Sequence, residues 1–206
     1  METFVRVTGI VAPLLRDNID TDVLIPSREM TQPGKAGYGE KLMAGWRYVQ
    51  DADGRRRENP DFVLNRAPFR QACFLVSGAN FGSGSSREQA VWALRQFGIR
   101  AVFAASFGAI FKNNCYRNGV LPVVLPRSDL ESLAAAAETG VLVMTVDLEA
   151  ERASLADGRA WPLAVPANER SMLLAGLDAI GLTLRLQERI TDFQAADRVR
   201  RPWIWR

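Results

Sequence analysis

Three largely apolar runs constrain the fold of this chain more than any other feature. They cover residues 72–78, 99–106 and 120–125, and each has the length of one buried strand. Two segments with helical periodicity, 87–98 and 107–119, separate them. Buried strands that alternate with helices are typical of an α/β sheet with parallel strand pairs. We therefore predict an α/β core in the middle of the chain.

The two helical patterns with the clearest signals are 87–98 and 128–140. The first ends at Gly98, a residue that commonly terminates helices, and the second opens with a Ser-x-x-Glu capping box at Ser128 and Glu131. The apolar face predicted for the first helix consists of Ala90, Val91, Ala93, Leu94 and Phe97.

Strands of a different kind are predicted on both sides of this core. Residues 4–14 alternate between apolar and polar positions and are β-branched, which favours an opening strand or hairpin. Residues 141–165 read as a hairpin that turns at Asp157–Gly158, and the remainder of the chain reads as mostly helical. These alternating strands suggest a second, antiparallel layer packed nearby.

The segment at about 27–61 is rich in glycine, proline and charge. A stretch of this length without strong periodicity indicates a functional excursion, with one helix expected over Tyr38–Tyr48. A chain of 206 residues fits one domain with such an excursion, so we expect a single domain over 1–206.

Composition excludes several function classes. The chain has no histidine, so Ser-His-Asp and Cys-His catalysis are excluded. Its two cysteines, Cys73 and Cys115, are distant in sequence, so the chain by itself cannot build an ordinary zinc or iron–sulfur site. A net charge of +3 with scattered basic residues is weak support for nucleic-acid binding. The N-terminus predicts neither a signal peptide nor a membrane span, and we expect a reducing cytoplasm.

The loop NFGSGSSREQ, residues 80–89, carries the strongest functional signal. It follows the apolar run at 72–78, and ligands of open α/β sheets bind at the carboxyl ends of the strands. Its glycines permit close backbone approach, and the helix that follows offers its N-terminus to an anion. Neither a dinucleotide fingerprint nor a P-loop is complete here.

Two interpretations of this loop are open from the residues alone. In one, Ser85 with Glu88, or Ser86 with Gln89, forms a capping box, and Arg87 is a solvated surface residue. In the other, Arg87 grips a ligand carboxylate, because an arginine in the first turn is unfavourable for the helix dipole.

Several motifs together resemble the swivelling domain of the aconitase superfamily. The resemblance is closer still to the small subunits of bacterial 3-isopropylmalate dehydratase, and it extends over nearly the whole chain. The motifs are NIDTDVLIP at 18–26, GYGEKLMAGWRYV at 37–49, the run from NFGSGSSREQ to NGVLPV at 80–123, and GLDAIGLTL at 176–184.

The resemblance implies a fold and a reaction. The fold is a swivelling β/β/α three-layer sandwich like the aconitase C-terminal domain. The reaction isomerises 2-isopropylmalate and 3-isopropylmalate by dehydration and rehydration in leucine biosynthesis. It implies a heterodimer whose large subunit holds a [4Fe–4S] cluster on three cysteines, with no cofactor in this chain. A paralogue acting on another 2-alkylmalate or a citraconate-like acid, and a non-catalytic binding subunit, are the alternatives.

The resemblance also implies roles for individual residues. Ser85 is the expected catalytic base, Ser86 is expected to hydrogen-bond a substrate oxygen, and Arg87 is expected to bind a substrate carboxylate. From the excursion, Arg28 and Lys35 are further expected substrate-binding residues. For Arg28 an ordinary surface position is equally plausible.

This chain departs from the family pattern at several positions. Ser83 stands where the family has cysteine, and Gln89 stands where it has histidine, with a capping role expected for Gln89. Glu29 replaces an apolar residue, either as an outward-facing loop residue or as a sign of a changed substrate. The tail RVRRPWIWR, residues 198–206, fits an interface anchor, self-packing or a membrane-surface patch, with self-packing as the default.

Overall fold

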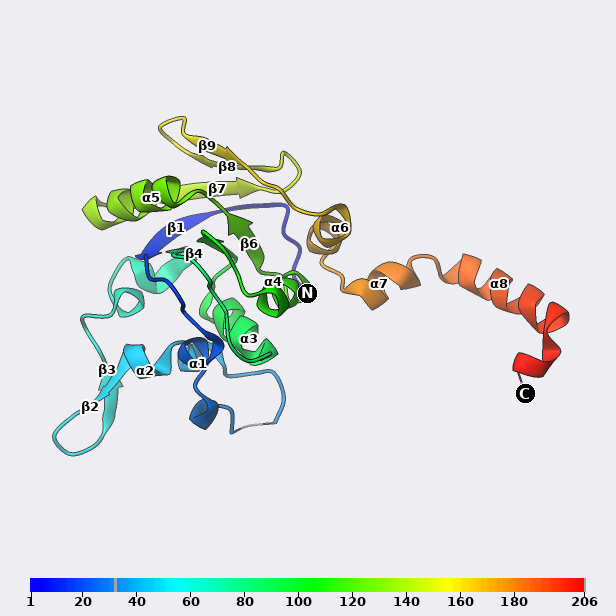
Figure 1. Cartoon of the computed structure of the whole chain (residues 1–206), viewed down its shortest axis with the longest axis horizontal. Helices are drawn as coiled ribbons and strands as arrows, with labels where there is room; N and C mark the ends of the chain where they lie inside the picture. The colour runs from blue at the N-terminus through cyan, green and yellow to red at the C-terminus, as the bar shows by residue number, and fades with distance from the viewer. Residues whose placement is uncertain (32, 206) are drawn as a thin grey trace.

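A computed structural model describes residues 1–31 and 33–205. The predicted excursion and tail each include one residue, Gln32 and Arg206, that lies outside the described residues. The centre of the molecule is a seven-stranded mixed sheet with the order β6-β5-β4-β1-β7-β8-β9 (Figure 1). In chain order the strands are β1 (Arg6–Leu14), β4 (Ala72–Ser77), β5 (Ala101–Ala104), β6 (Leu121–Val124), β7 (Val143–Asp147), β8 (Arg152–Leu155) and β9 (Ala160–Pro162).

Strand β1 joins the two halves of the sheet. Its C-terminal half, Ile10–Leu14, pairs in parallel with β4, and its N-terminal half, Arg6–Ile10, pairs antiparallel with β7. The pairs β4–β5 and β5–β6 are also parallel, which confirms the predicted α/β core. The antiparallel strands that we predicted as a second layer instead continue the same sheet. Strand β7 pairs with the free edge of β1, β8 pairs with β7, and β9 pairs with β8.

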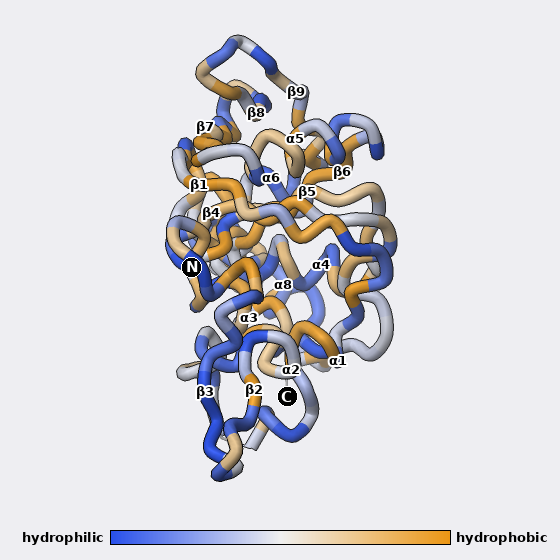
Figure 2. The backbone as a smooth tube through the Cα atoms, turned by 90° about the vertical axis from the view of Figure 1, so that its left-hand side faces the viewer, coloured by the Kyte–Doolittle hydropathy of each residue, from blue (hydrophilic) through white to orange (hydrophobic). Residues whose placement is uncertain are grey.

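Both faces of the parallel half are buried, as a nearly continuous apolar strand requires. Consecutive residues of β4 point to opposite sides: Phe74 and Val76 belong to one apolar cluster and Leu75 to the other. Helix α5 (Arg127–Thr139) packs on β1, β4 and β5, and α3 (Glu88–Phe97) and α4 (Ala109–Arg117) follow β4 and β5. Figure 2 shows the resulting band of apolar backbone across the middle of the molecule.

The structure confirms the predicted apolar face of α3. Ala90, Val91, Ala93 and Leu94 are fully buried, and Gly98 ends the helix in the left-handed region with φ +117°. The capping box predicted for α5 is wrong. The helix begins at Arg127, directly after Pro126, so Ser128 lies inside its first turn and caps nothing. Glu131 instead accepts a hydrogen bond of 2.9 Å from Arg127 Nε.

The predicted C-terminal hairpin is a three-stranded meander. The turn at Asp157–Gly158 is confirmed and connects β8 to β9, with Gly158 at φ +93°. A second turn at 148–151 divides the rest into β7 and β8. That turn is stabilised because Asp147 Oδ1 accepts the Ala150 N–H at 2.9 Å, and Glu151 adopts φ +49°.

The excursion contains only short elements. They are 3₁₀ turns at Ser27–Glu29 and Gly39–Lys41, α2 (Ala44–Arg47) and a hairpin of β2 (Tyr48–Gln50) and β3 (Arg56–Glu58), and the short helix α1 (Thr21–Leu24) precedes them. The helix predicted over Tyr38–Tyr48 is therefore largely wrong. Met43, at φ +48°, interrupts it between the 3₁₀ turn and α2. The hairpin projects from the body as a hydrophilic ribbon (Figure 2).

The end of the chain is helical, as predicted. Helix α6 (Ala167–Ala175) packs on α4, and α7 (Ala179–Leu184) and α8 (Gln187–Arg200) follow it, with a 3₁₀ turn at Pro202–Ile204. Figure 1 shows α8 projecting away from the sheet. In the described part of the chain, no helix combines the length and apolar character needed to cross a membrane.

Candidate active site

The candidate site is formed by loops that leave neighbouring parallel strands at their carboxyl ends. The loop after β1 and the loop after β4 continue side by side beyond the sheet. Gly82 N donates to Ile19 O at 2.7 Å, and Thr21 N donates to Ser83 O at 2.8 Å. The parallel pairing of two strands therefore extends into the segment that carries the serines.

A third loop, after β5, supports the serine loop from the other side. Phe81 N donates to Ser106 O at 3.0 Å, and Gly108 N donates to Phe81 O at 2.9 Å. The Phe81 ring is fully buried, with its centroid 6.1 Å from that of Phe107 and 5.5 Å from that of Phe111. Aromatic packing thus anchors the start of the serine loop in the core.

Gly82 is required by this packing. It adopts φ +71°, where side chains are strained, and a Cβ at this position would lie 2.1 Å from the Phe111 ring. The absence of a side chain lets the backbone pass directly over the first turn of α4.

Thr21 connects the two loops through its side chain. Its hydroxyl donates to the backbone carbonyl of Ser85 at 2.9 Å, and the residue is only 1% exposed. The Ser85 carbonyl also accepts the Arg87 N–H at 2.8 Å. The backbone of Ser85 is therefore fixed by two donors, while its hydroxyl is left for other contacts.

The serines do not cap α3, so the capping-box interpretation of this loop is wrong. The helix begins at Glu88, and its N-cap residue is Arg87, which has extended backbone and no side-chain capping bond. Ser85 and Ser86 are both exposed and precede the helix. Within the described residues their hydroxyls form no hydrogen bond, which leaves them available to a ligand. The capping role predicted for Gln89 is also wrong.

Arg87 is not the solvated surface residue of the alternative interpretation. Its side chain is 19% exposed, and its Nη1 forms an ion pair with Asp22 and donates to the Ile25 carbonyl at 3.3 Å. Asp22 in turn lines a cavity of about 440 Å³ together with Arg28 and Trp46. The fork of Arg87 is thus oriented from the loop after β1.

Arg28 lies beside that cavity and borders a second one of about 440 Å³ under the β2–β3 hairpin. Glu29 lines the second cavity and is not an outward-facing loop residue. Its side chain is 13% exposed and accepts two bonds, of 3.0 and 3.2 Å, from Arg56 on β3. Glu29 therefore attaches the hairpin to the excursion.

Lys35 lies elsewhere. Its Nζ is 5.0 Å from the centroid of the Trp92 ring, and its carbonyl accepts a hydrogen bond from Gln96, both on α3. Lys35 is not among the residues that line either of these two cavities. The structure thus brings Ser85, Ser86 and Arg87 together and places Arg28 across the Asp22 cavity, but it holds Lys35 on the side of α3.

Thr21 and Asp22 are site residues to which the sequence analysis assigned no role. Their partners are more than sixty positions away, at sequence separations of 64 for Thr21–Ser85 and 65 for Asp22–Arg87. The only sequence signal was their place after a predicted strand, in a motif that also carried the family resemblance.

The described residues do not fit an iron–sulfur cluster. No group of three or more histidine, cysteine or acidic side chains among them could hold a metal ion. Burial raises the pKa of the Cys115 thiol well above its usual value, and burial also raises the pKa of Cys73. Both thiols are thus disfavoured as thiolates, the form that binds metal.

Comparison with known proteins defines the class first. Residues 1–128 match the family model of the aconitase C-terminal domain, and residues 180–204 match the model of the C-terminal domain of the 3-isopropylmalate dehydratase small subunit. The crystal structure of 3-isopropylmalate dehydratase from Methanocaldococcus jannaschii is similar, with a TM-score of 0.66 and 26% identity over 91% of this chain and 99% of that one. The predicted fold class is confirmed.

Curated relatives then identify the family. The 3-isopropylmalate dehydratase small subunit of Cupriavidus necator is 52% identical over 206 residues, covering 99% of this chain and 98% of that protein. The small subunit of Rhodospirillum centenum is 47% identical and covers 98% of each chain. This chain belongs to the family of 3-isopropylmalate dehydratase small subunits, as its motifs predicted.

The steric role of Gly82 is testable with a matched pair of glycines. Gly82→Ala and Gly158→Ala both place a side chain at positive φ, which costs about 1–2 kcal/mol. Gly158 has nothing within 4 Å of an added Cβ, whereas Gly82 faces the Phe111 ring. Chemical denaturation should show that Gly82→Ala loses about 1–3 kcal/mol more than Gly158→Ala. Equal losses would mean that the loop does not pass over α4 as described.

The contact between Thr21 and Ser85 is testable by Thr21→Val, which keeps the shape but removes the donor. Stability should fall by about 1 kcal/mol, and the backbone order parameters of Ser85 and Ser86 in ¹⁵N relaxation should fall toward about 0.6. Thr8→Val is the control, because it removes a hydroxyl contact of 2.8 Å to Thr145 on the exposed sheet surface. Unchanged mobility in Thr21→Val would show that Thr21 does not fix the serine loop.

Proposed function

We propose that this chain supplies the substrate-binding loop and the catalytic base of a hydro-lyase that isomerises 2-isopropylmalate and 3-isopropylmalate in leucine biosynthesis. The observation that carries the proposal is the Ser85–Ser86–Arg87 loop, with both hydroxyls unused by the fold, in a member of the small-subunit family. The names of the relatives all point to this reaction, and no observation favours another 2-alkylmalate or a non-catalytic role.

Ser85 is proposed to remove the proton from the carbon next to a substrate carboxylate. The C–H electron pair becomes the new double bond as the hydroxyl leaves the neighbouring carbon with its bonding pair and is protonated to water. Water then adds back with hydrogen and hydroxyl on exchanged carbons, which gives the other isomer. A serine is a weak base at its ordinary pKa, so the alkoxide needs stabilisation. Support comes from α3, whose N-terminus begins three residues after Ser85 and favours negative charge.

Ser86 and Arg87 are proposed to hold the substrate. The guanidinium of Arg87 contacts Asp22 through Nη1 alone, so its other nitrogens can form the planar fork that a carboxylate accepts. Arg28 is proposed as the contact for a second carboxylate, because it lines the cavity that Asp22 also borders. Lys35 completes the proposed set, and to reach the substrate its ammonium group would have to leave the Trp92 ring.

A small subunit implies a large-subunit partner. We propose that this partner carries the iron–sulfur cluster, since the described residues of this chain have no ligands for one. The proposal also includes a single swivelling domain over 1–206, with the excursion at about 27–61, and a cytoplasmic location. The free thiols of Cys73 and Cys115 are in keeping with a reducing compartment.

The proposal is tested by exchange of the substrate proton with solvent deuterium in the assembled enzyme. Ser85→Ala should lower the exchange rate and kcat by at least about 100-fold, because a positioned base contributes typically 10²–10⁴-fold. The substrate KM should change little, since Ser86 and Arg87 are unchanged. The melting temperature of Ser85→Ala should match that of the unmodified chain, because the Ser85 hydroxyl does not cap α3.

Arg87→Lys separates carboxylate binding by Arg87 from proton removal by Ser85. It keeps the charge but loses the fork, so it should raise KM more than it lowers kcat. Near-normal proton exchange in Ser85→Ala would contradict the assignment of Ser85 as the base.

A further inference from the structure

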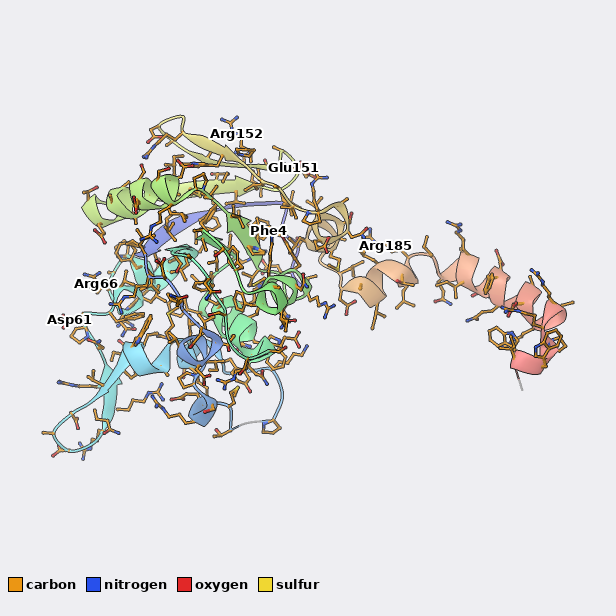
Figure 3. All side chains as sticks on the ribbon, viewed as in Figure 1. Phe4, Asp61, Arg66, Glu151, Arg152 and Arg185 are labelled. Carbon is orange, nitrogen blue, oxygen red and sulfur yellow. The ribbon has the colours of Figure 1, made fainter. Side chains whose placement is uncertain are left out.

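The C-terminal arm, residues 179–205, leaves the body of the molecule after α6. Its root is attached, because Leu182 of α7 packs against the core. Figure 3 shows the side chains of α8, beyond the labelled Arg185, standing clear of the body. In the part of the chain that the structure describes, each hydrogen bond and ion pair of residues 187–205 has both partners within the arm.

Helix α8 needs a partner to be stable. It has 14 residues, and isolated helices of that length are marginal in water. Most helices in proteins are stabilised by packing of an apolar face, and α8 packs against no other element of the body in Figure 1. The sequence of α8 nevertheless contains an apolar face that a partner could cover.

That apolar face consists of Leu186, Ile190 and Phe193, at spacings of four and three residues. The Phe193 side chain is 63% exposed. Val199, by contrast, lies on the other side of the helix and is 84% exposed. Leu186, Ile190 and Phe193 thus form an apolar stripe along the first half of α8, and Val199 lies apart from it.

Residues 197–205 form a folded hook at the end of α8. Asp197 accepts a hydrogen bond of 2.6 Å from Arg201 Nε and one of 3.0 Å from Trp205 Nε1. The Arg201 guanidinium, with a smaller contribution from Trp205, lowers the pKa of Asp197 and keeps it ionised. The Arg198 guanidinium lies 5.0 Å from the Trp205 ring centroid. The predicted self-packing of the tail is therefore confirmed for Trp205, whereas Trp203 remains 67% exposed.

The charges of the arm indicate the kind of partner. Arg189 lies beside the stripe and Arg200 follows it at the end of α8, and within the described residues neither has an ion-pair partner. A groove that receives the stripe would therefore carry acidic side chains along its rim. A second copy of this chain is a poorer candidate, because its α8 carries the same arginines beside the same stripe, and two such helices facing each other would repel.

We infer that α8 and its hook anchor this chain to the large subunit, by inserting the Phe193 stripe into an acidic-rimmed apolar groove of that subunit. The inference rests on the proposed function, which supplies the large subunit as partner. Phe193 and Trp203 are the expected hot spots, because exposed aromatic residues flanked by arginine typically dominate interface energetics. The anchor is spatially separate from Ser85, so it holds the partner without entering the reaction.

The test compares Phe193→Gln with Val199→Gln, which place the same polar residue on opposite sides of α8. The full-length chain is titrated with the purified large subunit, and Kd is measured by sedimentation velocity. Phe193→Gln should raise Kd at least about 30-fold, the loss typical of a hot spot, and Val199→Gln should change it less than about threefold. Neither variant should change the melting temperature of the chain alone or kcat at saturating large subunit.

An unchanged Kd in Phe193→Gln, or an equal loss in Val199→Gln, would overturn the anchor. A stable dimer of the chain alone that Phe193→Gln dissociates would assign the stripe to a second copy and overturn it too. These results are distinct from failure of the proposed function. In that case the unmodified complex would assemble, and Phe193→Gln would weaken it, but the complex would not isomerise isopropylmalate.

Discussion

The parallel pairing of β1 with β4 is the interaction on which the rest of the site depends. It does not stop at the edge of the sheet: the backbones of the two following loops stay paired as far as Thr21 and Ser83. Loops normally lose their register soon after a strand ends, which makes them poor supports for catalytic groups. Here the sheet effectively continues under the serine loop, and Ser85, Ser86 and Arg87 follow within four positions of the last paired residue, Ser83.

This extension explains why two distant motifs act as one unit. Thr21 and Asp22 come from the loop after β1, and they contact Ser85 and Arg87 from the loop after β4. One contact fixes a backbone carbonyl and the other orients a guanidinium, so both serine hydroxyls stay unused. A loop that capped its own helix would have satisfied its serines internally, and it would then offer a ligand fewer free donors.

The fold was predictable where local pattern and tertiary environment agree. The buried face of α3 and the runs that form β4, β5 and β6 follow from periodicity and length alone. Prediction failed where a single backbone angle or a partner distant in sequence determines the local structure. Met43 at φ +48° breaks an expected helix, and Pro126 starts α5 one residue before its expected cap. Neither of the two interpretations of Glu29, an outward-facing loop residue or a sign of a changed substrate, included its contact with Arg56, which is 27 positions away.

The central claim is that the serine loop is as rigid as the sheet that supports it, and native-state hydrogen exchange tests it most directly. The amides of Thr21 and Gly82 donate to Ser83 and Ile19, so they should exchange only through opening events as costly as those that expose β4. Amides of the exposed hairpin loop 51–55, whose hydrogen bonds are all made within the loop, provide the reference for local opening. Exchange of Thr21 and Gly82 as fast as that reference would contradict the account, because the two loops would then open independently of the sheet.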